Sequence, residues 1–475
     1  MKDRPEQPES YRKMLKNVAI LSGMWGMGIG AAFVQIPAAQ NVLVENGYSS
    51  ISTVPLGLIF LLSSPCAIWI PKLITRYGEK KIRLLASIIG IVGSLLQMTG
   101  VLLSKDSDTL SPFELTLILF GASIQAFTYA SSNNLRFAVA QFVSKEFLPK
   151  ATALVLFGGV ISSLLGPLLS NVTRHMLPVA DYAGNFLQIS IMYFVFGILS
   201  LLADFEPPQY NQSNKNVNDD VLGDTLNMIL ADEGRISIED DEEDDTRSET
   251  DKKELTTDRT LSDILFETEL ILLTCFQCLS YNIMALYMTQ VQLPMISLGY
   301  SADARTNTIT AHMIAMFLPG LVTGFIIDAI GTWTTTLLGF VAFIVGGGIM
   351  LANDSLTMFI VGMTMIGAAW NLTFVGPSSE ISRICHTQAE KTKVVGFNDG
   401  IMLATIGIFS LTGSLIYQAI DSWRMYNVLL MIVSGISALI AAWREVKYRL
   451  QPLIEANSRA FSESLSFDQQ LLDQL

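Results

Sequence analysis

Charged residues are scarce in this chain of 475 residues: only 15% are Asp, Glu, Lys or Arg, whereas 50% are hydrophobic. Soluble globular domains carry about 25% charged residues, so the composition excludes that class. The apolar residues come in runs of roughly 20, the length that an α-helix needs to cross a hydrocarbon core of about 30 Å. The sequence therefore predicts an integral membrane protein embedded in a lipid bilayer.

Cysteine and histidine are also rare. Of the four cysteines, Cys275 and Cys278 have the spacing of redox and metal sites, but both lie in an apolar run and we interpret them as packed small side chains. The three histidines lie in separate segments, and no glycine-rich phosphate-binding loop follows a strand. We therefore expect no metal, no cofactor and no enzymatic activity.

Clustered basic residues are missing too, which argues against nucleic-acid binding. The net charge of −13 includes a run of seven acidic residues from Glu239 to Asp245, and such runs are usually solvated. No cleavable signal peptide is recognisable, because the first apolar run, from about Val18 to Val42, is too long and lacks a small-residue cleavage site. We expect this run to be the first membrane helix.

The apolar runs predict twelve membrane helices, six on each side of a long polar segment. The first six cover 17–41, 52–73, 82–104, 113–142, 149–172 and 185–204, and the second six cover 265–292, 304–327, 333–352, 356–383, 392–417 and 424–444. The expected domains are an N-terminal segment (1–16), a six-helix half (17–204), a linker (205–264), a second six-helix half (265–444) and a tail (445–475). Polar and charged residues dominate the linker, so we expect it to be disordered.

Basic residues predict the orientation, because short loops rich in Lys and Arg stay cytoplasmic. Only four of the 30 Lys and Arg residues fall in the alternate set of loops: Lys105, Arg174, Arg305 and Arg424. Both termini and the linker are therefore expected in the cytoplasm, where Ser237, Thr246 and Ser248 would suit an acid-directed kinase. The segment Asp468–Leu472 is similar to an acidic dileucine signal for sorting adaptors, which leaves the plasma membrane and a vacuolar or endolysosomal membrane as alternatives.

A short motif ends the second helix of each half. Pro71-Lys-Leu-Ile-Thr-Arg-Tyr-Gly78 is echoed by Gly324-Phe-Ile-Ile-Asp-Ala-Ile-Gly331. Many secondary transporters are built from such repeated halves, with the substrate held between them. The echo therefore predicts a duplicated six-helix plan.

These halves resemble the major facilitator superfamily, whose loop between helices 2 and 3 reads G-x-L-x-D-R-x-G-R/K-R/K. The first copy keeps Leu73, Arg76, Gly78, Lys80 and Lys81, with Pro71 for Gly and Thr75 for Asp; the second keeps Gly324, Asp328 and Gly331, with Ala329 for Arg. Gly158, Gly159, Gly166 and Pro167 are similar to the family's glycine-rich helix-5 motif. Segments around Arg136, His312 and Asp399 resemble a largely uncharacterised prokaryotic and fungal branch.

The resemblance implies an all-α membrane protein with twelve transmembrane helices in two pseudo-symmetric halves. It also implies that helices 1, 4, 7 and 10 line a central cavity. Polar residues midway along those helices are the substrate-cavity candidates: Gln35, Gln125, Tyr129, Asn133, Gln277, Tyr281, Trp370 and Asn371. Hydrogen bonding between helices, worth roughly 0.6 kcal/mol each, is the alternative for every one of them.

Charged residues nearer the cytoplasmic ends of the helices suit a gate, where pairs form in one state and break in another. The gate candidates are Arg76, Gly78, Arg136, Gly324, Asp328, Gly331, Glu380 and Arg383, with Asp328 as an expected partner of Arg383. Direct contact of Arg136 with the substrate is the alternative. His312 and Asp399 are candidates for proton coupling, with helix packing as the alternative for both.

We expect a monomeric transporter, secondary active or facilitative, that moves a small polar solute by alternating access. Coupling of this transport to protons is one of the alternatives. A non-transporting receptor or scaffold that acts through the linker and tail is the alternative function. No filter-like sequence that would indicate a channel is visible.

Overall fold

The computed structural model describes residues 8–106, 109–143, 148–205, 264–385 and 388–473. Within these ranges the regular elements are all helical. The expected linker apart from its end residues Phe205 and Ile264, its acidic run and its three candidate phosphorylation sites lie outside the described residues. The fold predicted from the sequence, an all-helical membrane protein, is confirmed.

The first half contains seven α-helices and several short helical turns. They are α1 (Pro8–Glu45), η1 (Ser49–Ile51), α2 (Val54–Tyr77), α3 (Glu79–Leu103), η2 (Ser104–Asp106), α4 (Pro112–Ala138), η3 (Val139–Gln141), α5 (Leu148–Ser163), the π-helical turn η4 (Leu164–Leu168), α6 (Leu169–Arg174) and α7 (Ala183–Leu202). Helix α4 begins with a capping box in which Ser111 and Glu114 bond to each other's backbone N–H groups.

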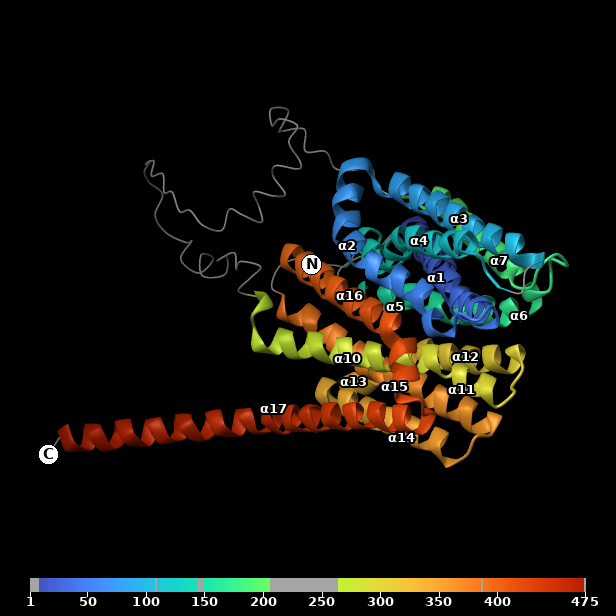
Figure 1. Ribbon diagram of the computed structural model, residues 1–475. Coiled ribbons are helices and arrows are strands. Elements are labelled where there is room, and N and C mark those ends of the chain that lie inside the picture. Colours follow the sequence, from blue (N-terminus) through green and yellow to red (C-terminus); the bar gives the residue numbers. More distant parts are fainter. Residues whose placement is uncertain (1–7, 107–108, 144–147, 206–263, 386–387, 474–475) are drawn as a thin grey trace, which may run out of the picture.

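The second half repeats this plan with eight α-helices. They are α10 (Thr268–Gln290), α11 (Gln292–Ser297), α12 (Ala302–Phe317), α13 (Gly320–Ile330), α14 (Thr332–Ala352), α15 (Leu356–Ile384), α16 (Gln388–Ile420) and α17 (Trp423–Asp473). Helix α17 has 51 residues and runs far beyond the bundle as one rod, so most of the expected tail continues the last membrane helix (Figure 1).

Eleven helices in the described ranges are long and apolar enough to cross a membrane, and a bent pair makes a twelfth if it is one span. The pair is α12 and α13, which meet at 45° around Pro319. The sequence predicted one uninterrupted helix over 304–327, and the break follows from Pro319, whose backbone nitrogen cannot donate a helical hydrogen bond. Similarly, Pro167 lies in the π-helical turn inside the predicted span 149–172.

The two echoed motifs end in the same backbone turn. Gly78 has φ 86° and ψ 148°, and Gly331 has φ 86° and ψ 162°, a region that only glycine adopts readily. Each glycine ends one helix and directly begins the next. We call the end of the bundle that carries Gly78 and Gly331 the motif end, and the other the opposite end.

The halves lie side by side, the first coloured blue to green and the second yellow to red (Figure 1). Helix α2 packs along α16, and α5 packs on α12, so each half contributes one helix to each contact. In the α2–α16 contact, a Cβ added to Gly407 would lie only 2.4 Å from the Leu61 nitrogen. Backbones that approach so closely form a tight seam between the halves.

Candidate functional site

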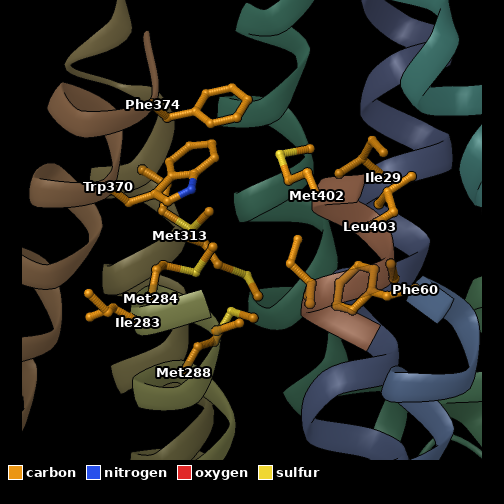
Figure 2. Close-up of a cluster of buried hydrophobic side chains, with 14 of the residues drawn as sticks. Ile29, Phe60, Ile283, Met284, Met288, Met313, Trp370, Phe374, Met402 and Leu403 are labelled. Atoms are coloured by element: carbon orange, nitrogen blue, oxygen red, sulfur yellow. The ribbon is translucent and has the colours of Figure 1, made fainter. Parts of the chain in front are cut away.

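An apolar layer lies where the halves meet. Figure 2 shows side chains of the two halves facing each other: Ile29 from α1, Phe60 from α2, Met284 and Met288 from α10, Met313 from α12, Trp370 and Phe374 from α15, and Met402 and Leu403 from α16. All are buried and belong to one hydrophobic cluster that spans both halves. Thioether and aromatic side chains are polarizable, and methionine adapts its shape to irregular partners.

Aromatic rings form the densest part of this layer. The rings of Trp370 and Phe374 are stacked, with centroids 4.8 Å apart, and Tyr281 lies edge-on to both. Phe317 contacts Trp370 edge-on at 5.9 Å and also Trp25 of the first half at 5.6 Å. The rings therefore form a continuous path from one half to the other.

Several polar atoms in or beside this layer have no hydrogen-bond partner among the described residues. They are the indole nitrogens of Trp25 and Trp370 and both side-chain polar atoms of Gln35. These three side chains are at most 4% exposed. Buried polar groups are nearly always satisfied, so these atoms are candidates for hydrogen bonds to a molecule that enters the interface.

Other candidates from the sequence make hydrogen bonds inside one half. The amide of Gln125 donates to Gln97 at 2.6 Å and accepts from Tyr193 at 3.1 Å. The amide of Asn371 donates to the Met316 carbonyl at 2.7 Å and accepts from Thr323. Both arrangements are the bonding between helices that the sequence left open as an alternative.

Tyr129 and Tyr281 lie against each other across the two halves, and Phe60 lies edge-on to Tyr129 at 5.2 Å. Gln277 donates to Ser378 and accepts from Asn398 at 2.6 Å, which ties α10 to α15 and α16. Asn133 is half-buried on α4. Tyr129 belongs to the apolar layer itself, and Tyr281 packs against it.

Next to these tyrosines, Arg136 of α4 donates a hydrogen bond to Asp399 of α16. Their side chains are 11% and 7% exposed, so this ion pair between the halves is largely buried. A buried pair gains much of its strength from the low local dielectric, and either charge alone would be costly there. The pair can therefore hold the motif end of α4 and α16 together.

A different set of contacts joins the halves at the opposite end. Gln40 donates to the Thr289 carbonyl at 2.6 Å and accepts from Gln292 at 2.8 Å, and Arg305 donates to Asn41 at 3.1 Å. A cavity of about 10 Å³, lined by Gln35, Gln40 and their neighbours, has room for about one water molecule. This seal of amides and one arginine was missed in the sequence because amides near helix ends carry no distinctive pattern.

The second-half motif lies beside a cavity of about 340 Å³ at the motif end. Asp328 and Arg383 both line it, but Arg383 pairs with Glu380 at 3.3 Å instead of the expected Asp328. Arg383 and Glu380 are three residues apart on α15 and so lie on the same helix face. In the first half, the guanidinium of Arg76 is exposed and lies 5.4 Å from the centre of the Tyr77 ring.

The remaining motif residues are placed by packing. A Cβ on Gly158 would lie 2.1 Å from the Ser22 carbonyl oxygen, and one on Gly166 would lie 3.1 Å from that of Gly30, so α5 lies directly on α1. Gly324 has open space around it. The fully buried ring of His312 bonds through Nδ1 to the Met363 carbonyl at 2.8 Å, within the second half.

A buried charge cluster at the motif end of the first half was also missed. Arg83 is fully buried and donates to Glu79, to Ser131 and to Asn134, while Gln141 donates to Glu79. The signal was present, because a Glu and an Arg four residues apart at the start of an apolar run can pair on one helix face.

Known proteins resemble this chain along most of its length. The sequence model described as "Major Facilitator Superfamily" matches residues 109–385. The riboflavin transporter RfnT of Brucella anthropi is 25% identical over 87% of this chain and 91% of its own. The uncharacterised MFS-type transporter YddS of Bacillus subtilis is 22% identical over 93% of both chains. The solved structure of a mutant of the nucleoside transporter NupG, 11% identical, has a TM-score of 0.57 over 91% of this chain and 99% of its own.

Proposed function

Because this chain belongs to the Major Facilitator Superfamily, whose model matches more than half of it, we propose that it carries a small uncharged solute with a planar heteroaromatic ring. The chain is a multi-pass membrane transporter. The observation that carries the proposal on its solute is the buried aromatic layer between the halves. Two of its indole N–H groups have no hydrogen-bond partner among the residues that the structure describes.

The chemistry of this layer supports that class of solute. Trp370 and Phe374 offer faces and edges to a planar ring, which gains about 0.5–1.5 kcal/mol per aromatic contact beyond its burial. The indole N–H groups would donate to carbonyl oxygens or ring nitrogens, and the Gln35 amide can both donate and accept. A relative that transports riboflavin, whose flavin ring has this chemistry, supports the same choice.

We propose alternating access as the mechanism. The amide seal around Gln40 would close the opposite end, and the Arg136–Asp399 pair would close the motif end. Opening either seal while the other holds would expose the aromatic layer to one side at a time. The distribution of Lys and Arg supports a cytoplasmic location for the motif end and both termini.

We propose Asp399, and not His312, as the site of any proton coupling. Protonation of Asp399 would remove the charge that holds Arg136 and so loosen the contact between the halves. His312 bonds to the Met363 carbonyl within the second half, so a change of its charge would act first inside that half. Uptake with and without a pH gradient checks this: a gradient effect that survives Asp399→Asn but not His312→Gln would reverse the assignment.

Uptake of radiolabelled riboflavin and uridine into proteoliposomes tests the proposed function. Wild type should accumulate at least one of them, and Trp370→Ala should slow its uptake about tenfold. Trp443→Ala removes an indole that is 57% exposed on the outside of the helix bundle and should leave uptake unchanged. Absence of uptake of both probes would exclude this solute class.

A receptor or scaffold function is the alternative, and no contact in the described residues favours it. If filling the layer with Met284→Trp left cellular function intact while abolishing uptake, the scaffold would be supported.

We also propose sorting to an endolysosomal membrane through Asp468–Leu472, in the last turns of α17. Microscopy of a Leu471→Ala, Leu472→Ala variant checks this, since retained sorting would contradict it.

A further inference from the structure

Phe317 lies at the break between helices α12 and α13 of the second half. It is the last residue of α12, and Leu318 and Pro319 follow it before α13 departs at 45°. Pro319 removes a backbone hydrogen bond at this point, so α12 and α13 can change their angle without breaking a regular helix. A change of the angle between the two helices would therefore move the side chain of Phe317.

The ring of Phe317 is inserted into the first half. It lies between Trp25 and Phe33, which are eight residues apart on α1, with centroid distances of 5.6 and 5.8 Å. On α5, Gly159 leaves the space that the ring needs, because a Cβ there would lie 2.5 Å from Cδ1 of Phe317. The ring thus connects α12 to both α1 and α5 across the interface.

The same ring lies among the unpartnered donors. Trp25 and Trp370 both contact Phe317 edge-on, and both indole nitrogens lack a hydrogen-bond partner among the described residues. The phenyl ring of Phe317 fills the space between the two indole rings and makes aromatic contacts with them, but it offers no hydrogen-bond acceptor in its plane. A heteroaromatic ring of similar width would supply both the contacts and the acceptors.

We propose that Phe317 occupies the ring position of the solute while the transporter is empty, and that solute binding displaces it. This inference rests on the proposed function. The exchange replaces one set of aromatic contacts by another, so it is nearly balanced, and the two indole hydrogen bonds favour the solute. Phe317 is thus a specificity-determining residue, because a solute without a flat ring cannot compensate for the lost contacts.

The exchange also connects binding with movement. Once displaced, the ring leaves the space beside Gly159, and the contact between α12 and α5 in this region is lost. The break at Pro319 then allows α12 to tilt. Solute binding would thereby release the contact between α12 and α5, while the seam between α2 and α16 stays closed.

Two measurements on the full-length protein in nanodiscs test this inference. The first is the riboflavin Kd of wild type, Phe317→Ala and the control Phe325→Ala, which removes a phenyl ring that is 75% exposed on α13. Removal of the competing ring should lower the Kd roughly three- to tenfold, the value of one aromatic contact, whereas the control keeps the wild-type Kd. An unchanged or raised Kd in Phe317→Ala would overturn ring exchange even if riboflavin is transported.

The second measurement needs no solute. Asn171 and Asn307, which bond at 3.2 Å between α6 and α12, are replaced by cysteines after the four native cysteines are changed to serine. Phe317→Ala removes the ring, and Gly159→Ala introduces a methyl group that clashes with it. Each variant should slow cross-linking by a short bifunctional thiol reagent severalfold. The double variant should cross-link no more slowly than either single variant. If wild type binds neither riboflavin nor uridine but cross-linking slows, the solute class is wrong and the role of the ring in joining α12 to α5 stands. Unchanged cross-linking overturns that role.

Discussion

Arg136 of α4 and Asp399 of α16 are 263 residues apart in the chain and form a buried ion pair between the two halves. The pairs Lys16–Asp204, Glu79–Arg83, Glu45–Arg174, Glu380–Arg383 and Glu269–Arg444 each lie within one half. Separating a buried ion pair that joins two moving halves adds an electrostatic cost to the opening of the contact.

Loss of either charge of this pair should disable the motif-end gate. Asp399→Asn leaves Arg136 buried and unpaired, which costs about 3–5 kcal/mol and favours the state in which water reaches the guanidinium. We expect a more than tenfold loss of uptake and faster thiol labelling of cysteines placed at that end. Arg383→Ala, whose partner Glu380 lies on the same helix, serves as the control and should change neither.

Exchanging the two charges provides a stricter test of the pair. Arg136→Asp combined with Asp399→Arg keeps the attraction and should recover part of the uptake that each single variant loses. A double variant no better than the worse single variant would mean that Arg136 or Asp399 acts by itself, for example by contacting the solute.

The turns at Gly78 and Gly331 should be equally intolerant of a side chain. Both have φ near 86° with an extended ψ, so Gly78→Ala and Gly331→Ala should each cost about 1–3 kcal/mol of stability. Thermal unfolding followed by size-exclusion chromatography would detect this loss. Gly324→Ala, in a helix with open space around it, should instead be neutral or stabilising.

The Glu79–Arg83 cluster should matter for stability rather than for solute recognition. Arg83→Ala leaves Glu79 buried and removes the donor that holds Ser131 and Asn134 on α4. We expect a loss of about 3–5 kcal/mol, seen as a lower Tm in detergent. Protein that still folds should keep the wild-type KM for its solute, and a raised KM would place the cluster in the transport path.

The seam between α2 and α16 should respond to a single methyl group. Gly407→Ala introduces a carbon 2.4 Å from the Leu61 nitrogen, and crowding of this kind costs about 1–3 kcal/mol. The variant should show a lower Tm and cross-link less efficiently between cysteines at Ser64 and Gly400, whose side chain and carbonyl bond at 2.8 Å. Gly435→Ala, with its nearest neighbour at 3.9 Å, is the matched control.

The sequence predicted the membrane fold well because length and apolarity alone select a spanning helix. It predicted the depth of a polar residue in the membrane better than the direction in which its side chain points. Gln125 and Tyr129 lie one turn apart on α4, yet Gln125 bonds inside its half whereas Tyr129 contacts Tyr281 of the other half. Which way a helix faces depends on partners that are distant in the sequence. For the same reason Arg136 and Asp399 were both singled out without being paired, and Phe317 was not noticed at all.

The uninterrupted rod formed by α17 has a consequence beyond the bilayer. Between Gln451 and Asp473 the helix covers about 33 Å at 1.5 Å per residue. If the second half tilts during the transport cycle, the end of α17 near Asp473 moves through a larger distance than the part of the helix inside the bundle.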